Sequence, residues 1–257
     1  MNAEYIPYDR CNILGVDVSV TSLDKTLNTI TAGLLNLKGH YICVSNVHTI
    51  VMSYDDRHYR AIQNNGYMVL PDGKPLSIVS RLRGHKNARR VTGPDLMGSM
   101  FNISERNGYR HFFYGSTNET LEMLKSELVK RYPSLNIAGM FSPPFRELTK
   151  LEDNEIVDMI NQSRPDFIWV GLGAPKQEYW MSRNRGKLKG LMIGVGAGFD
   201  YFAGNINRAP LWMQKMSLEW LFRLIQEPQR LWKRYLVYNT RFLILVIKES
   251  LKSRYNI

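Results

Sequence analysis

Six apolar runs of strand length, separated by segments with the period of a helix, constrain the fold of this chain more than any other feature. The runs are HYICVSN (40–46), GYMVLPDG (66–73), RHFFYGS (110–116), LNIAGMF (135–141), DFIWVGLG (166–173) and GLMIGVGAGFD (190–200). Alternation of strand and helix is typical of a parallel sheet that helices cover on both faces. The sequence therefore predicts an α/β fold with a Rossmann-like, doubly wound, mainly parallel sheet.

The segments between the runs carry start signals of helices. The candidate N-cap residues are Ser22 or Asp24, Thr117 or Asn118, and Thr149. After Arg208-Ala-Pro the strand-like runs stop, and the remaining chain has only helical patterns. We therefore predict an α/β body over residues 1–207 and a helical C-terminal appendage over residues 208–257.

Positive charge is concentrated in the appendage. The chain has a formal net charge of +11, and residues 208–257 hold ten Lys or Arg against three Glu. Drawn as one helix, the appendage has a basic side with Arg230, Arg234, Arg241 and Lys248, and an apolar side formed by Trp232, Tyr235, Leu236, Leu243, Val246 and Ile247. This pattern is typical of a helix that lies on an anionic membrane surface. The alternative is an amphipathic helix packed on the body, and the two can hold in different states.

Other features favour a protein that stays inside the cell. The N-terminus lacks the basic and apolar regions of a secretory signal. No apolar run approaches the roughly 20 residues that span a bilayer. Cys11 and Cys43 lie in apolar surroundings without metal-ligand spacing, so we expect two buried thiols.

Small and polar residues follow the predicted strands, at the edge where open parallel sheets bind ligands. They are Asn46, Asp72, Gly73, Gly115, Ser116, Gly171, Gly173, Gly194, Gly196, Gly198 and Asp200. Glycines there let a phosphate approach the backbone, or they only permit tight packing of strand against helix. Neither glycine cluster matches a dinucleotide fingerprint, and no P-loop motif occurs.

Asp72 is the most informative acidic residue, since it ends an apolar strand in the sequence Leu-Pro-Asp-Gly. A turn alone explains Asp-Gly, whereas a functional carboxylate there could act as a general base on a hydroxyl. Other candidates are weaker. His48 is expected to be structural, residues 152–155 to form an acidic first helical turn, and the basic run of residues 81–90 to be solvated, although Arg90 could be drawn toward a phosphate.

Seven motifs together indicate a family. They are LPDG (70–73), RRVTGPDL (89–96), FFYGS (112–116), GLGAPKQE (171–178), GVGAGFDYFAG (194–204), NRAP (207–210) and LEWLFRLIQEPQR (218–230). In this order the chain resembles the WecG/TagA/CpsF glycosyltransferases, family 26. The resemblance implies that the body is catalytic. It implies inverting transfer of an N-acetylmannosamine-type or related sugar from a UDP-sugar to an undecaprenyl-diphosphate-linked sugar.

The same resemblance implies a place for the enzyme, in the synthesis of a cell-surface polysaccharide such as teichoic acid, enterobacterial common antigen, capsule or exopolysaccharide. It implies a peripheral protein on the cytoplasmic face of the bacterial inner membrane. Which sugar moves, and whether the protein forms a homo-oligomer, are left open.

Residue roles follow from the matched motifs. The resemblance implies a catalytic set of Asp72, Asn46, Arg90 and Gln177. In this set Asp72 is the base, Asn46 and Arg90 line the pocket, and Gln177 of the PKQE motif is expected to orient a sugar hydroxyl or phosphate. The residues expected to bind substrate are Gly73, Gly115, Ser116, Gly171, Gly173, Lys176, Gly196, Asp200, Arg208, Arg223, Arg230 and Arg234. Val44 departs from the family, in which a threonine is common two residues before Asn46.

The sequence predicts no metal site and no cofactor. The five histidines are scattered and no Asp-x-Asp occurs, so we expect arginines of the appendage to neutralise the departing UDP. Two other classes of protein would account for part of the sequence. A basic nucleic-acid-binding protein would account for the charge, but no recognition motif supports it. A nucleotide-dependent oxidoreductase would account for the sheet, but the fingerprint is missing.

Overall fold

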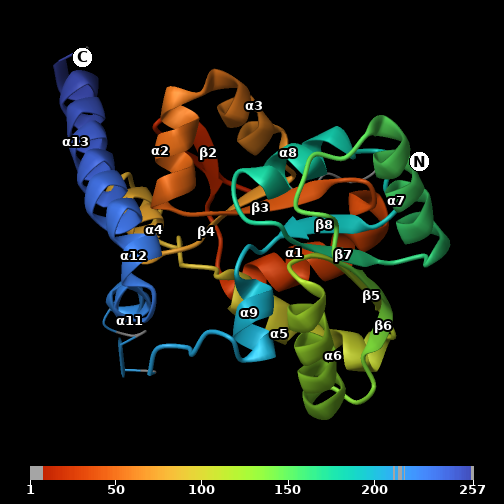
Figure 1. Ribbon diagram of the computed structural model, residues 1–257. Coiled ribbons are helices and arrows are strands. Elements are labelled where there is room, and N and C mark those ends of the chain that lie inside the picture. The colour runs from red at the N-terminus through yellow and green to blue at the C-terminus, as the bar shows by residue number, and fades with distance from the viewer. Residues whose placement is uncertain (1–7, 211, 214–215, 217, 256–257) are drawn as a thin grey trace.

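A six-stranded parallel sheet forms the centre of the computed structural model, which describes residues 8–210, 212–213, 216 and 218–255 (Figure 1). The order across the sheet is β4-β3-β8-β7-β5-β6. The bounds are β3 (Tyr41–Ser45), β4 (Met68–Pro71), β5 (Arg110–Gly115), β6 (Asn136–Phe141), β7 (Phe167–Gly171) and β8 (Leu191–Gly194). Every pairing in this sheet is parallel, which confirms the α/β fold and all six predicted strands.

Helices cover both faces of the sheet, because the strands are apolar on both sides. In β7 the side chains of Phe167 and Trp169 enter one core cluster, and those of Ile168 and Val170 enter another. The first cluster is completed by α1 (Leu23–Leu37), α5 (Gly93–Asn107), α6 (Asn118–Arg131) and α9 (Gly198–Ala203). The second is completed by α7 (Lys150–Gln162) and α8 (Lys176–Arg183).

The helix starts agree with the sequence signals. The side chains of Ser22, Thr117 and Thr149 accept hydrogen bonds from the first turns of α1, α6 and α7. The segment between the first two predicted strands forms two helices, because Asp56 ends α2 (Val47–Asp55) and caps α3 (Arg57–Asn65). The remaining helix of the body is α4 (Lys74–Leu82).

A short antiparallel hairpin, which the sequence did not reveal, precedes α1. It consists of β1 (Arg10–Ile13) and β2 (Val16–Ser19). Its strands have four residues each, too few for a clear alternation signal. Leu14 and Gly15 form the turn with φ angles of 52° and 88°.

Both predicted buried thiols are confirmed, since Cys11 is 2% exposed and Cys43 is fully buried.

The appendage is helical, but it is not one regular helix of the kind drawn from the sequence. It contains α11 (Glu219–Gln226), α12 (Pro228–Lys233), the π-helix η1 (Arg234–Tyr238) and α13 (Asn239–Tyr255). Pro228 starts a new helix, and the wider π turn shifts the facing of all later residues. Arg241 is therefore not part of a free basic side: its guanidinium pairs with both oxygens of Asp55 on α2, at 2.5 and 2.6 Å.

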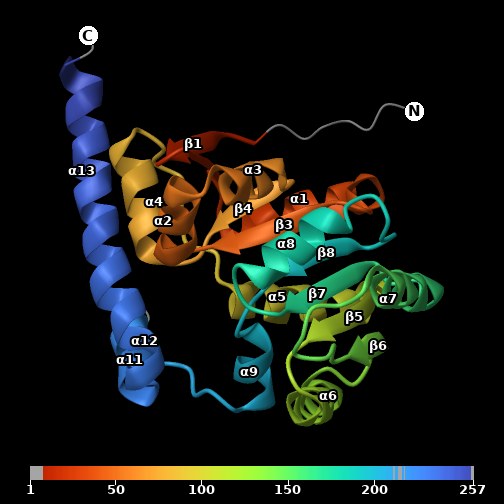
Figure 2. The same ribbon diagram turned by 45° about the horizontal axis from the view of Figure 1, so that its top comes forward.

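One side of α13 packs on the body along α2 and α4 (Figures 1 and 2). Phe242 is 1% exposed in a core cluster with residues of those helices and of the hairpin. On α13, and on α12 and η1 before it, a set of large apolar side chains is exposed, and we call this set the apolar stripe. It comprises Trp232, Leu236, Leu243, Ile244, Ile247 and Leu251. Within the described residues, no helix combines the length and apolar character that crossing a bilayer requires.

Candidate active site

The carboxyl ends of β4, β3 and β8 bring three predicted site segments together. Because β3 lies between the other two strands, Asn46 follows the central strand, with Asp72 on one side of it and Gly196 on the other. The Asp72 backbone N–H donates to the Ser45 carbonyl at 2.7 Å, which fixes the turn after β4. The side chain of Asp72 is half-buried at this edge. Gly73 follows with a φ of 106°, a conformation that suits glycine.

Asn46 lies at this edge of the sheet, and its side chain also makes hydrogen bonds within the protein. Its Oδ1 accepts from the backbone N–H groups of His48 and Thr49, so it caps α2. Val44, where the family often has threonine, is 7% exposed and packs in the main core cluster. Valine has no hydroxyl, so position 44 cannot make the contact that the resemblance implies for a threonine there.

Gln177 is buried beneath the site. Its Oε1 accepts from the Gly196 N–H at 3.0 Å, and its Nε2 donates to Glu178 Oε1 at 2.8 Å. Gln177 is 3% exposed and Glu178 is fully buried. Gln177 thus holds the turn after β8 in this structure, and both ends of its amide are used within the protein. Pro175, the first residue of the PKQE motif, is the N-cap of α8 and not its first helical residue.

The predicted glycines fall into two groups. A Cβ on Gly115 would lie 2.6 Å from the Gly171 carbonyl carbon, and a Cβ on Gly171 would lie 2.7 Å from the Phe199 ring. For these two, the packing alternative accounts for the glycine. Gly173 has a φ of 77° with nothing within 4 Å of its notional Cβ, and Gly196 is almost as open. Gly173 and Gly196 therefore leave room beside the backbone.

The remaining predicted residues of this edge are less involved. Ser116 follows β5, and its carbonyl accepts a hydrogen bond from the Ser142 hydroxyl. Lys176 is exposed to solvent at the start of α8. Asp200 on α9 accepts a hydrogen bond from Asn205 at 3.2 Å.

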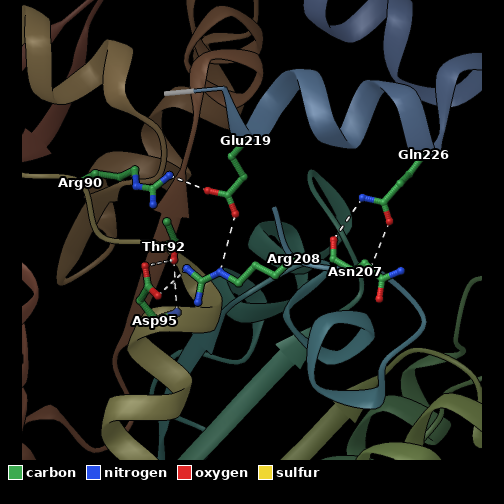
Figure 3. A network of polar contacts seen from close by, with 7 residues as sticks. All are labelled: Arg90, Thr92, Asp95, Asn207, Arg208, Glu219 and Gln226. Atoms are coloured by element: carbon green, nitrogen blue, oxygen red, sulfur yellow. Dashed lines mark hydrogen bonds and ion pairs between the residues drawn. The ribbon is translucent and has the colours of Figure 1, made fainter. Parts of the chain in front are cut away.

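An ion-pair network joins the body to the appendage (Figure 3). Arg90 donates to Glu219 of α11 at 2.6 Å, and the second oxygen of Glu219 lies 3.8 Å from Arg208. Arg208 also pairs with Asp95 at 2.5 Å, and Asp95 accepts from the Thr92 hydroxyl. Two predicted site arginines are thus brought together around one carboxylate. Glu219 was missed because nothing in the local pattern links it to residue 90.

A second link holds the connecting segment to α11. Asn207 and Gln226 exchange two hydrogen bonds, from the Asn207 N–H to Gln226 Oε1 and from Gln226 Nε2 to the Asn207 carbonyl (Figure 3). Their lengths are 3.2 and 3.1 Å. This amide clamp keeps α11 close to the residues that follow α9.

Among the described residues of the appendage, Arg223 of α11 best fits the predicted role of neutralising a departing diphosphate. Its side chain is 17% exposed, and its buried Nε–H meets no acceptor among the residues that the structure describes. Burial lowers the pKa of the Arg223 guanidinium, but the surrounding groups Tyr201, Tyr235, Glu227 and Asp72 together outweigh burial and raise it. The guanidinium lies over the ring of Tyr201, a residue not singled out in the sequence although it directly follows Asp200. The side chains of Arg230 and Arg234 lie outside the described part of the structure.

This arrangement can assist a displacement reaction. A carboxylate can accept a proton, and a half-buried guanidinium with an open Nε–H donor can stabilise a departing diphosphate. In the described part of the chain, no group of three or more His, Cys, Asp or Glu side chains is placed to hold a metal ion. A basic hollow of about 610 Å³, bordered by Lys25, Lys86 and Arg89, lies elsewhere and does not include Asp72.

Comparisons with known proteins cover both parts of the chain. The family profile of the Glycosyl transferase WecG/TagA/CpsF family matches residues 11–256. The N-acetylglucosaminyldiphosphoundecaprenol N-acetyl-beta-D-mannosaminyltransferase of Bacillus subtilis (strain 168) is 31% identical over 213 residues, 82% of this chain and 80% of that protein. The proteins of the same name from Bacillus spizizenii (strain W23) and Staphylococcus aureus (strain MW2) are 31% and 29% identical, over 86% and 88% of this chain and 83% and 86% of their own length.

The match begins in the hairpin and ends in α13, so it includes the strand edge and the arginines of the appendage. The family profile and the relatives agree with each other and with the motifs, and neither rival class is favoured. The chain belongs to the WecG/TagA/CpsF family of glycosyl transferases.

Proposed function

We propose that the enzyme transfers an N-acetylmannosamine-type sugar from a UDP donor to N-acetylglucosamine carried on diphosphoundecaprenol. The names of the relatives support this acceptor and this sugar. The observation that carries the proposal is that Arg223 of the appendage lies over the ring of Tyr201 of the body, 5.4 Å from its centroid, with a buried Nε–H that meets no acceptor among the described residues. The charge of Asp72 contributes to the raised pKa of the same arginine.

In the proposed reaction Asp72 is the general base. It takes the proton of an acceptor hydroxyl while the hydroxyl oxygen forms a bond to C1 of the donor sugar. The bond from C1 to the diphosphate breaks on the opposite side, so the anomeric centre inverts and the electron pair leaves with UDP. Arg223 neutralises the leaving diphosphate, with Arg90 and Arg208 as further cationic donors. Metal independence stays a prediction, as does self-association.

The proposal includes a peripheral membrane location on the cytoplasmic face of the membrane. The acceptor named for the relatives is a polyprenyl lipid, which an enzyme must meet at a membrane. The apolar stripe of the appendage and the chain's net charge of +11 both suit an anionic lipid surface. The product would be a disaccharide on a lipid carrier, used for a cell-surface polysaccharide.

A donor panel tests the proposal. The purified full chain is mixed with an undecaprenyl-diphosphate-N-acetylglucosamine analogue and, in turn, UDP-linked N-acetylmannosamine, N-acetylglucosamine, glucose and galactose. We expect transfer from the N-acetylmannosamine donor and a β linkage by NMR. Absence of transfer from every UDP-sugar would refute the proposal. Protection against heat by NAD but not by UDP-sugars would favour the oxidoreductase instead.

A further inference from the structure

The position of Arg223 needs a restraint from the body. Its carboxylate partner Glu227, at 3.6 Å, lies four residues later and next to the same helix. That pair moves with α11, so it cannot fix the arginine relative to Asp72. No side chain in α11 itself is buried, so the helix is not locked in place by a core of its own.

Tyr201 supplies a contact from the body. It lies on α9, the helix that follows β8, and the centroid of its ring is 5.4 Å from Cζ of Arg223. A guanidinium within about 6 Å of an aromatic ring is attracted to its face, and the attraction is stronger where water is excluded. Both side chains are only partly accessible, so the pair meets that condition.

The ring, and not the hydroxyl, makes this contact. Burial raises the pKa of the Tyr201 phenol. The charge of Arg223 opposes that rise, but the net shift is upward, and the charges of Glu219 and Asp72 add to it. The phenol is therefore neutral at physiological pH and does not pair with Arg223 as an anion. What it offers the guanidinium is a flat aromatic surface, which phenylalanine would offer equally.

We propose that Tyr201 is a positioning residue whose aromatic ring holds Arg223 beside Asp72 for the leaving diphosphate. The inference rests on the proposed function and adds a residue that acts through the arginine. It also explains how α11, a helix with no buried side chain, can present a guanidinium at a defined place. Tyr201 needs no contact with the substrate in this role.

Two substitutions separate ring from hydroxyl. Tyr201→Phe keeps the ring, and we expect its UDP affinity by calorimetry and its kcat/KM for the UDP-sugar to stay within about twofold of wild type. Tyr201→Leu removes the ring, and we expect both to fall about tenfold. Tyr201→Met serves as a second variant if the leucine form is unstable, with thermal unfolding as the measure of folding.

A double-mutant cycle tests whether Tyr201 acts through Arg223. In an Arg223→Ala background the Tyr201→Leu change should cost less than about twofold, because its target is gone. Full additivity would overturn the inference, as would wild-type behaviour of Tyr201→Leu and Tyr201→Met, or equal losses in the Phe and Leu forms. These outcomes leave the proposed function standing. A wild-type chain that neither binds UDP nor transfers sugar would overturn both.

Discussion

The body and the appendage are held by different forces. The body is built on a sheet buried on both faces, with strand residues such as Trp169 and Ile193 fully inaccessible. In the appendage, α11 buries no residue and meets the body through ion pairs such as Arg90–Glu219, while α13 is anchored by Phe242. Ion pairs near the surface contribute only about 0–1 kcal/mol each and weaken with salt. The proposed base, Asp72, is thus held by the core of the body, whereas the position of Arg223 depends on a few polar contacts of α11 and on the ring of Tyr201.

The largest expected effect is on kcat, from a substitution that removes the proposed base of the body and leaves the appendage unchanged. Asp72→Asn should lower kcat by about 10²–10⁴-fold, since the amide cannot accept the proton of the acceptor hydroxyl. UDP affinity should change little. Asp158→Asn, an exposed change on α7, is the control for loss of one carboxylate. Turnover of Asp72→Asn near that of wild type would remove Asp72 from the role of base.

The next effect concerns the outer side of the appendage. Leu243 and Ile247 are each 58% exposed on the apolar stripe, so replacing both by Glu should not disturb folding. It should weaken binding to anionic vesicles about 100-fold, because two apolar contacts are lost and two negative charges gained. Leu35→Glu, at a residue 83% exposed on α1, is the matched change on the body. An equal loss in the control, or none in the double variant, would contradict membrane contact through the stripe.

A smaller effect concerns the core of the body. Burial lowers the pKa of His111 to about 3, and its Nδ1 accepts the Trp169 indole N–H at 2.9 Å. The folded state keeps this histidine neutral, while the unfolded state takes up a proton below about pH 6.5. Stability should therefore fall as the pH drops from about 6.5 toward 3. His111→Gln cannot titrate, so between pH 7 and 5 wild type should lose on the order of 2 kcal/mol more than this variant in urea unfolding. Equal losses would show that His111 does not govern the acid response.

The smallest effect lies at the junction. Glu219 competes with a diphosphate for Arg90 and Arg208, so Glu219→Gln should raise UDP affinity about threefold. Glu249→Gln removes a comparable pair between appendage and body, with Arg83 at 2.6 Å, away from the site. It should leave UDP affinity unchanged. A fall in affinity for Glu219→Gln would mean that the carboxylate orders the arginines instead of blocking them.

The same contrast explains what the sequence could predict. Local signals identified the six strands of the central sheet, the caps at Ser22 and Thr149, and the place of Asp72 at a strand end, but not the hairpin of β1 and β2. They could not reveal pairs such as Arg90 with Glu219, which lie 129 residues apart, because no periodicity connects them. The burial of Gln177 depends on how α8 packs beneath the turn at Gly196, and that is likewise a tertiary contact. The direction in which the side chains of α13 face depends on the π turn η1, which a plot at fixed helical pitch cannot show.

The central claim is that the body and the appendage form one active site, through Arg223. It is tested most directly by the UDP affinities of Arg223→Ala and Arg241→Ala, measured by calorimetry in detergent. Each variant removes one appendage arginine, but Arg241 is paired with Asp55 outside the site. The account predicts at least a tenfold loss for Arg223→Ala and no change for Arg241→Ala. Equal affinities in the two variants would contradict it.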